Sequence, residues 1–370
     1  FFFILVMLRG GFGSVCRLSS SLNGFGFVSS RTIGTTFIKR NYCTPGVVTN
    51  EFQPKLTVIG VGGGGGNAVN HMISSGMDGV HFIVCNTDVQ ALSQTLTPNR
   101  VRLGKELTKG LGAGAKPAIG EKAAEHDLEH ILSLDSVKKA NMVFVAAGMG
   151  GGTGTGAAPV IAKGLQDAGI LTVGVVTCPF VFEGPVRSRQ AKIGLENLQQ
   201  NVDTLIVIQN QRLIEIATET KNFSFSDAFK LADDVLTKGV RTITDLIIKP
   251  GLVNLDFGDV RTILKSSKVD GKVGRSLMGT ATASGDNRAV EAAISATTNR
   301  LLDNQSLHGA RGILINITGG QDLSLIEIEE AANIIQEKAH PDAEIVWGAS
   351  TDDSMHGEIS VSVVACGLGV

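Results

Sequence analysis

The 370 residues are enough for two domains with cores of their own, and a hydrophobic fraction of 43% with 18% charged residues is typical of a globular protein. A formal net charge of −2 and the lack of a basic stripe argue against a nucleic-acid partner. The five cysteines form neither a CxxC pair nor a zinc-binding spacing, so we interpret them as free thiols in a reducing compartment.

The first fifty residues have the composition of a targeting segment. From Met7 to Asn50 there is no Asp or Glu, and the basic residues are spread among Ser, Gly and Thr: Arg9, Arg17, Arg31, Lys39 and Arg40. This pattern is typical of mitochondrial and plastid transit peptides. The alternative is a secretory signal with Phe1–Leu8 as its apolar part, but no positively charged region precedes those residues. We therefore predict a disordered transit peptide over residues 1–50.

The end of this segment indicates a destination. Arg40-Asn41-Tyr42 before Cys43 resembles a mitochondrial processing site, with an Arg a few residues before the cut. We predict translation from Met7, cleavage near Cys43 and residence in the mitochondrial matrix, with the plastid stroma as the alternative. No later segment reaches the ~18 apolar residues that a bilayer span needs, so no transmembrane segment is expected.

Strands and helices alternate in the chain that follows Glu51. Short apolar runs predict strands at residues 55–60, 81–84, 141–147, 171–177 and 204–208. The segments 68–75 and 157–167 have helical patterns and stand between strands. This alternation predicts a doubly wound, mostly parallel sheet.

A long buried helix is predicted over residues 227–248. Apolar side chains cover most of its circumference: Phe229, Leu231, Ala232, Val235, Leu236, Val240, Ile243 and Leu246. Lys249-Pro250-Gly251 then ends the helix. Beyond it we expect helices at 289–302 and 325–338 and strands at 312–318, 344–349 and 358–366. The predicted fold class is therefore α/β, with a central helix that joins the parallel sheet to a second, smaller α/β domain.

A glycine run, GVGGGGGN at residues 60–67, follows the first predicted strand. Glycines let backbone N–H groups approach phosphate oxygens, and the N-terminus of the following helix attracts anions. On its own this run also fits a dinucleotide-binding fold, because Asp88 follows about twenty residues later at the end of the second strand.

A second glycine run decides between these alternatives. GMGGGTGTG at residues 148–156 also follows a strand and opens a helix. A dinucleotide-binding domain needs one such loop, whereas a nucleotide with three phosphates could use both. The sequence contains no G-x-x-x-x-G-K-[ST] motif, so it is not a P-loop NTPase.

GGGTGTG at residues 150–156 resembles the signature of the tubulin/FtsZ family of GTPases. Further motifs follow in FtsZ order, at residues 62–67, 86–88, 110–115 and 180–184 and, as NLDFGDV, at 254–260. The resemblance covers about residues 54–367. It implies an enzyme that uses GTP/GDP and Mg²⁺ and polymerises head to tail into filaments. With the transit peptide, it implies an organelle division ring in mitochondrial fission, with plastid division as the alternative.

The resemblance also implies the nucleotide-binding residues. The phosphates would lie against Gly63, Gly64, Gly65, Gly66 and Asn67, and against Gly150, Gly151, Gly152, Thr153, Gly154, Thr155 and Gly156. The γ-phosphate and Mg²⁺ would be approached by Gly112, Ala113, Gly114 and Ala115. The ribose would lie near Glu183 and Arg187, and guanine or ribose near Asn210 and Asp233. Phe229 could stack on the base, and plain core packing is its alternative.

The predicted catalytic residues Asn254, Asp256 and Asp259 are expected in a loop after the central helix. In the family this loop enters the GTP site of the next subunit, where the carboxylates would orient or polarise the attacking water. Turn and helix-cap chemistry is the alternative interpretation. Because a helix of about twenty residues spans ~30 Å, the loop cannot reach the GTP of its own subunit.

These assignments divide the chain into a transit peptide (1–50), a GTP-binding domain (51–226), the central helix (227–248), a catalytic loop (249–260) and a C-terminal domain (261–370). The expected partners are other copies of the chain and an unidentified adaptor that tethers the filament to a membrane. Bacterial FtsZ proteins usually continue with a linker and an adaptor-binding peptide beyond the position of Val370. Two departures from the family pattern are Gly258 in place of Ala and Gln209-Asn210-Gln211 in place of Pro-Asn-Asp/Glu, and the second leaves the role of Asn210 open.

Two other functions were weighed against this one. A dinucleotide-dependent oxidoreductase leaves the second glycine run and NLDFGDV unexplained. A relative that binds nucleotide without hydrolysing it is disfavoured because Asp256 and Asp259 are both present.

Overall fold

The computed structural model of the chain describes residues 53–217, 225–249, 251–253, 255–265, 268–269, 272–299, 302 and 304–368. These residues belong to one compact unit, Asn50–Val370. The predicted transit peptide and its processing site lie outside the described residues, so both stay predictions.

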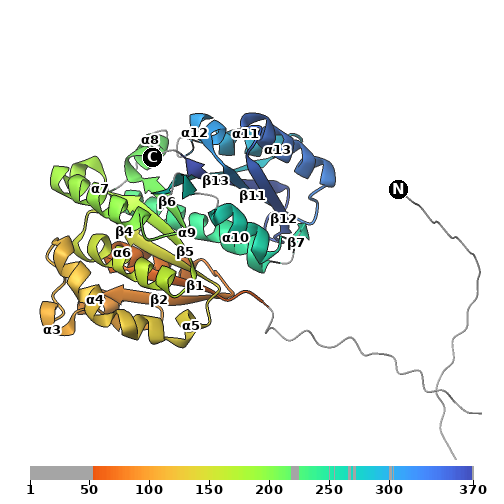
Figure 1. Cartoon of the computed structure of the whole chain (residues 1–370). Coiled ribbons are helices and arrows are strands. Elements are labelled where there is room, and N and C mark those ends of the chain that lie inside the picture. Colours follow the sequence, from red (N-terminus) through yellow and green to blue (C-terminus); the bar gives the residue numbers. More distant parts are fainter. Residues whose placement is uncertain are drawn as a thin grey trace, which may run out of the picture. The chain divides into compact units, whose positions relative to one another are not determined.

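Six parallel strands form the first half of the sheet, in the order β3-β2-β1-β4-β5-β6 (Figure 1). They are β1 Leu56–Val61, β2 Val80–Asn86, β3 Arg100–Arg102, β4 Met142–Gly148, β5 Leu171–Cys178 and β6 Thr204–Gln209. The helices between and after them are α1 Gly62–Ser74, α2 Val89–Ser93, α3 Lys105–Thr108, α4 Pro117–Ser133, α5 Asp135–Lys138, α6 Gly152–Asp167, the 3₁₀ turn Val181–Glu183, α7 Pro185–Gln199 and α8 Asn210–Ala217. Parallel strands end at one edge of a sheet, so the segments that follow them converge there.

The core of this half has two layers because successive strand residues point to opposite faces. Val58 and Phe144 pack in the cluster on one face, and Ile59 and Val145 pack in the cluster on the other. All four side chains are fully buried. Both faces of the sheet are therefore covered, as a parallel sheet requires.

The second half of the sheet is mixed, in the order β10-β13-β11-β12-β7. Its strands are β7 Gly251–Val253, β10 Arg275–Ser284, β11 Gly312–Gly319, β12 Glu344–Thr351 and β13 Glu358–Leu368, and β8 Lys268–Val269 and β9 Lys272–Val273 form a separate hairpin. Its helices are α10 Phe257–Lys265, α11 Arg288–Thr297, α12 Asn304–Gly309 and α13 Leu325–Lys338. The pair β11–β12 is parallel, whereas β13 is antiparallel to both of its neighbours.

The helix α9, Phe225–Ile248, lies between the two halves (Figure 1). It packs against β5 and β6 of the first half and against β11 and β12 of the second. Buried side chains such as Val240 and Ile243 face these strands in the core. The two halves also join directly, because Arg275 and Ser276 of β10 pair with β6.

The structure confirms the α/β class, the mostly parallel first sheet and the long central helix. The predicted domain boundaries stay predictions. The glycine runs, expected as loops, instead form the first turns of α1 and α6. The helix expected at 289–302 ends at Thr297, where Thr297 and Thr298 donate hydroxyl hydrogen bonds back to the carbonyls of Ala293 and Ile294. Such bonds and β-branching weaken a helix, which explains the early end.

Several elements were not predicted, among them α7, α10 and β10. The sequence of β10, RSLMGTATAS, is poor in large apolar residues and has no clear strand signal, and its place is set by pairing with β13 over most of its length. None of the described helices is long and apolar enough to cross a membrane.

Candidate functional site

A cavity of about 440 Å³ opens where the first sheet ends. Its walls come from the segments after β1, β4, β5 and β6 and from one end of α9. Twelve of the predicted nucleotide-binding residues line it: Gly63, Gly64, Asn67, Gly151, Gly152, Thr153, Gly154, Glu183, Arg187, Asn210, Phe229 and Asp233. Segments far apart in the sequence thus meet around one space, as the two glycine runs led us to expect.

The first glycine run forms the start of α1. A helix leaves its first N–H groups without partners inside the helix, and among them those of Gly63 and Gly64 belong to residues that line the cavity. A Cβ at Gly63 would meet nothing within 4 Å, so the backbone there is open to a ligand. Gly65 and Gly66 do not line the cavity, and a Cβ at Gly65 would overlap the carbonyl oxygen of Ala146. Gly65 is therefore needed for packing against β4.

The second glycine run forms the start of α6, and its residues divide in the same way. Thr153 lines the cavity, and its hydroxyl lies 2.7 Å from that of Thr87. Thr155 is turned away, since its hydroxyl accepts a hydrogen bond of 2.8 Å from the N–H of Gly150. A Cβ at Gly156 would overlap the carbonyl oxygen of Pro117 in α4. The structure places Gly150, Thr155 and Gly156 outside the cavity lining, where they shape the loop and its packing.

The loop of Gly112, Ala113, Gly114 and Ala115 also lies outside the lining. It touches the second run, because a Cβ at Gly152 would lie 2.8 Å from that of Ala113. The N–H of Gly112 donates to the carbonyl oxygen of Thr87 at 3.3 Å. Ala115 has a φ of 57°, which is uncommon for a residue other than glycine. The loop is therefore a neighbour of the phosphate-facing backbone.

The opposite wall carries aromatic and charged side chains. Phe229 is 38% exposed, and its ring lies edge-on to Phe180 with centroids 5.4 Å apart. The Phe229 ring is therefore partly buried and partly exposed, and its exposed part can contact a base. Glu183 forms an ion pair with Arg187 one turn later, and its other oxygen accepts from the N–H of Phe180 at 2.9 Å. The ion pair places both groups at the mouth of the cavity.

Burial is unfavourable for two polar side chains in this wall, those of Asp233 and Asn210. Burial raises the pKa of the Asp233 carboxyl to about 7, because the charged form loses its hydration. The Oδ1 atom of Asn210 is buried, and no described residue donates to it. Buried acceptors are normally satisfied, so a ligand with N–H or O–H donors would fit here. Guanine offers an N–H and an amino group on one edge, which suits the Asp233 carboxylate.

The residues around the cavity therefore fit a guanine nucleotide: its lining contains glycine backbone open to a ligand, the unsatisfied Oδ1 of Asn210 and the partly buried carboxyl of Asp233. Mg²⁺ is a different matter. In the described part of the chain no three His, Cys, Asp or Glu side chains come together as a metal site. Mg²⁺ commonly keeps several waters and binds through substrate phosphates, so it would be held mainly by the nucleotide.

The predicted catalytic residues lie away from this cavity. Asp256 and Asp259 are exposed and do not line it, and Asn254 lies outside the described residues. The segment 249–260, expected as a loop, contains β7 and the start of α10. Asp259 sits in the first turn of α10, and its N–H donates to Oδ1 of Asp256 at 2.8 Å. Asp256 thus acts as a helix cap, which was the alternative interpretation, and its carboxylate stays exposed.

Sequence reasoning missed six lining residues: Gly148, Met149, Thr177, Pro179, Ala232 and Leu236. Gly148 and Met149 belong to the second glycine run at residues 148–156, from which only residues 150–156 were assigned to the phosphates. Ala232 and Leu236 lie three residues after Phe229 and Asp233, respectively, and therefore share their helix face. Thr177 and Pro179 follow from the end of β5, which only the sheet order reveals.

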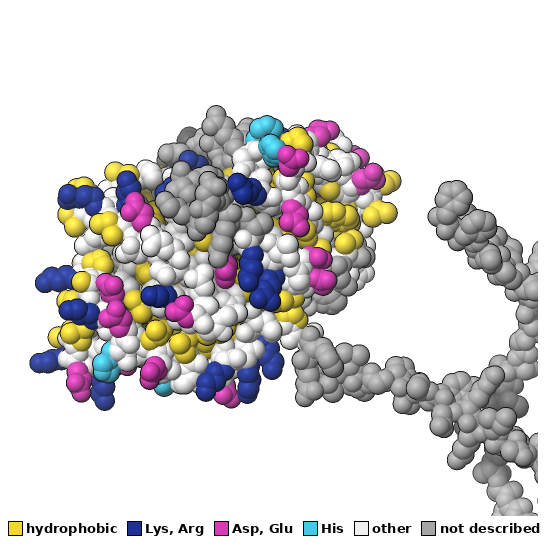
Figure 2. All heavy atoms as spheres, viewed as in Figure 1, with side chains coloured by type: hydrophobic (Ala, Val, Ile, Leu, Met, Phe, Trp, Pro, Cys, Tyr) yellow, Lys and Arg dark blue, Asp and Glu magenta, His cyan; other side chains and the backbone are white. Residues whose placement is uncertain are grey.

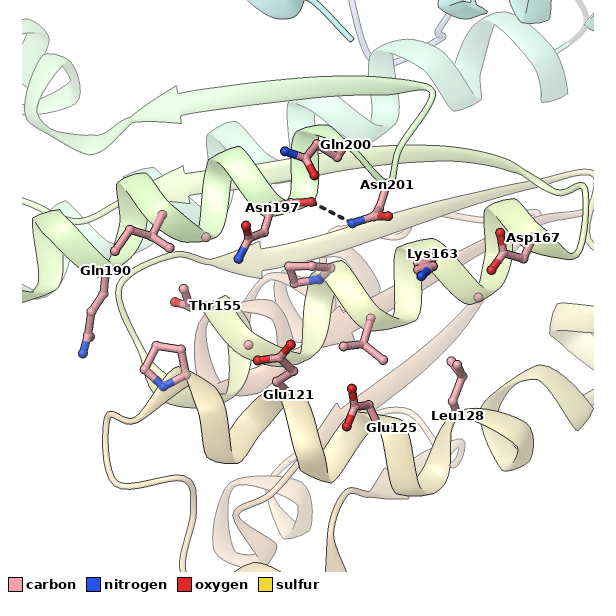
Figure 3. A pocket seen from close by; sticks show the side chains of 17 residues that line it. Glu121, Glu125, Leu128, Thr155, Lys163, Asp167, Gln190, Asn197, Gln200 and Asn201 are labelled. Atoms are coloured by element: carbon pink, nitrogen blue, oxygen red, sulfur yellow. Dashed lines mark hydrogen bonds between the residues drawn. The ribbon is translucent and has the colours of Figure 1, made fainter. Parts of the chain in front are cut away.

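A second and larger cavity, of about 890 Å³, lies between α4, α6 and α7 (Figure 3). Its lining includes Glu121 and Glu125 of α4 and Lys163 of α6. The labelled amide side chains of Asn197, Gln200 and Asn201 belong to its α7 side. Its walls are helix faces, and the two glycine-rich helix starts do not converge on it. On the face of the molecule drawn in Figure 2, basic and acidic side chains are interspersed.

Family comparisons agree with this geometry. Residues 55–218 match the family described as "Tubulin/FtsZ family, GTPase domain", and residues 274–369 match "FtsZ family, C-terminal domain". The two matches fall on the first and second halves of the sheet. Segment 219–273, which contains the whole of α9, connects them.

Similar proteins are bacterial and archaeal. The "Cell division protein FtsZ" of Magnetospirillum gryphiswaldense is 55% identical over 318 residues, which are 86% of this chain and 55% of that protein. "Cell division protein FtsZ 2" of Rhizobium meliloti is 52% identical over 87% of this chain and 90% of that protein. A solved "FtsZ dimer, empty" from M. jannaschii has a TM-score of 0.79 at 40% identity, over 85% of this chain and 88% of that one. The chain thus spans about half the length of some relatives and most of others.

Proposed function

This chain belongs to the FtsZ family of the tubulin superfamily, and on that basis we propose that it is a GTPase that assembles head to tail into division filaments. The observation that carries the proposal is the cavity at the sheet edge. Two glycine-rich helix starts, from β1 and β4, face one space together with Asn210 and Asp233. Two phosphate-binding helix starts suit a nucleoside triphosphate, and a carboxylate acceptor suits guanine.

In the proposed complex the backbone N–H groups of Gly63, Gly64 and residues 151–154 bind the phosphates. Glu183 and Arg187 lie at the ribose, and Phe229 contacts the base. Mg²⁺ would be held mainly by the nucleotide phosphates, and it would supply positive charge there. Water attacks the γ-phosphorus, the bond to the β–γ bridging oxygen breaks, and GDP, inorganic phosphate and a proton are released.

The water is activated in this proposal by Asp256 and Asp259 of the next subunit, with Asn254 beside them. The 24 residues of α9 span ~36 Å. Asp233, near the start of α9, lines the cavity, whereas Asp256 and Asp259 follow its other end. A straight helix of that length keeps the two groups of one chain apart. Hydrolysis then requires contact between copies.

A nucleotide-release assay separates the proposed function from its competitors. Purified protein is denatured, and the bound nucleotide is identified after incubation with GTP, ATP and NAD. We expect guanine nucleotide alone to be retained. Release of NAD would favour a dinucleotide enzyme, and retained GTP without turnover at any protein concentration would favour a non-hydrolysing relative.

Mixing two variants tests the shared site. Gly154→Val should not bind GTP, since its Cβ would lie 2.6 Å from the carbonyl oxygen of Gly148. Asp259→Ala should bind GTP and form long-lived filaments without hydrolysing it. Each is inactive alone, and mixing should restore turnover, because the first offers an intact Asp259 to GTP held by the second. A GTPase rate per subunit that does not depend on concentration would rule out the shared site.

We also propose an organellar location, which rests on the acid-free composition of residues 7–50. A fluorescent protein fused behind residues 7–51 should enter mitochondria, and the mature N-terminus should fall near Cys43. Import into plastids would support the alternative location. Retention in the cytosol would refute both. The filament would then act in organelle division and reach a membrane through an adaptor.

A further inference from the structure

The loop of residues 112–115, beside the second glycine run, accepts a hydrogen bond from a side chain of α7. Nε2 of Gln190 in α7 donates to the carbonyl oxygen of Ala115 at 3.1 Å. These residues are 75 positions apart in the chain. Because a carbonyl can only accept, this contact fixes which end of the Gln190 amide faces the loop. In the described part of the chain, no other side chain donates to residues 112–115.

The loop needs such a hold because its backbone is strained at Ala115, which has a φ of 57°. The φ values of 86° at Gly112 and 57° at Gly114 are ones that glycine adopts readily. A left-handed alanine persists only where its surroundings fix it. Its own backbone supplies one hydrogen bond of 3.1 Å, from the N–H of Lys116 to the carbonyl oxygen of Ala113. Ala115 itself is exposed, so burial does not hold it in place.

The helix α7 links this hold to the proposed nucleotide site. Arg187 lines the cavity, and Gln190 follows three residues later, one turn along the helix. The carbonyl oxygen of Arg187 would lie 2.9 Å from a Cβ at Gly150, so the helix rests on the second glycine run. The loop touches the same run at Gly152. In Figure 3 the Gln190 side chain extends from α7 away from Glu121 and Glu125, at one end of the groove.

The other end of the Gln190 amide is its oxygen atom, Oε1. Oε1 of Gln190 is buried, and none of the described residues donates to it. A buried acceptor without a donor reduces what the side chain contributes to folding stability. The role of the Gln190 side chain is therefore better explained by the position that it gives to the loop than by stabilisation of α7.

We propose that Gln190 is a positioning residue for the proposed GTPase reaction, which holds the loop of residues 112–115 where it meets the terminal phosphate. The inference rests on the proposed function. The place of the loop at the γ-phosphate is what the family resemblance implies. In this structure the loop lies outside the cavity lining and touches Gly152 of the second glycine run. Gln190 therefore determines how strongly the site prefers GTP to GDP.

The test compares two ligands on the whole chain. Gln190→Met keeps the length of the side chain and removes the donor. We expect its Kd for GTPγS to rise roughly threefold to tenfold, the effect of one neutral hydrogen bond, with the Kd for GDP unchanged. Gln190→Glu, which also lacks the donor at neutral pH, should do the same. The KM for GTP should rise by a similar factor, and kcat should stay within about twofold.

Gln200→Met is the matched control. Gln200 is an exposed glutamine at the end of the same helix, in the same groove, and it should change neither affinity. Equal losses of GTPγS and GDP affinity in Gln190→Met would show a merely structural role and overturn the proposal, as would no loss of either. Thermal unfolding of each variant checks the fold. Wild-type protein that binds GDP but shows no preference for GTPγS would refute the loop's role, whereas binding of neither would refute the proposed function itself.

Discussion

The pKa of Asp233 makes a prediction about nucleotide binding that pH alone can test. Burial raises this pKa from 3.8 to about 7, so the carboxyl is only about half ionised in the free protein at neutral pH. The guanine edge presents donors, and only the ionised carboxylate accepts from both. Nucleotide binding should therefore select the ionised form and release a proton wherever the free protein holds one.

The size of the effect follows from the titration. At pH 8 about nine tenths of the carboxyl is ionised, and at pH 6 about one tenth. The Kd for GDP should rise about tenfold between these values because of Asp233. In the absence of nucleotide, the pH dependence of the stability that Asp233 contributes has the opposite sign to that of a salt-bridged acid. A raised pKa means that the folded chain binds the proton more tightly, so its contribution to stability falls as the pH rises from about 4 to about 7.

Isothermal titration calorimetry at pH 6 and pH 8 gives both the affinity and the protons released, when it is repeated in buffers of different ionisation enthalpy. The phosphates of GDP also titrate in this range, and Asp233→Asn is the control for them. The variant keeps the phosphate contribution and loses the carboxyl contribution. An equal pH dependence in the wild type and in Asp233→Asn would refute the reasoning, because the carboxyl would then not titrate on binding.

Three further results are expected. Gly154→Val should raise the Kd for GTP by more than about tenfold, whereas Gly309→Ala, where a Cβ would meet nothing within 4 Å, should leave it unchanged in the same filter-binding assay. Arg288→Met should lower the free energy of unfolding by about 1.5–3 kcal/mol in urea titrations, because Arg288 is buried and bonded to Asp322 and Glu327. The Arg288 and Ser324 hydrogen bonds lower the pKa of Glu327 to about 2, so the stabilisation is present above about pH 4.5 and lost as the pH falls toward 2. Cys85 and Cys366 are fully buried with pKa values raised to about 12, so mass spectrometry should find both unalkylated in native protein and alkylated after unfolding.

Local sequence patterns predicted the first half of the sheet well because its strands are buried on both faces and so consist of apolar runs. The second half of the sheet was harder to predict from the sequence. β10 consists mainly of small and polar residues, and its strand state comes from pairing with β13, a contact between distant segments. The helix α7 carries a start signal, Gly184 followed by Pro185, that could have been used. Its later residues are mostly polar, so no apolar face announced it.

The site shows a different limit. The sequence identified where phosphate-binding glycines occur, but it did not separate glycines that face a ligand from those that face the protein. Gly63 and Gly151 are open to the cavity, whereas Gly65 and Gly156 are pressed against carbonyl oxygens of β4 and α4. All four lie in the same two runs and are chemically identical. What distinguishes them is the path of a neighbouring backbone, which local sequence does not encode.

Asp256 serves as a helix cap without losing the exposure that a catalytic role requires. Its Oδ1 accepts the N–H of Asp259 and so fixes the start of α10. The cap fixes the Asp256 side chain to the backbone of Asp259, while both carboxylates stay exposed. Exposed carboxylates cost little to maintain in a monomer, and under the proposed function they would act where a second copy supplies the phosphates and excludes bulk solvent around the attacking water. Helix capping would therefore be a means by which one subunit presents Asp256 to the next.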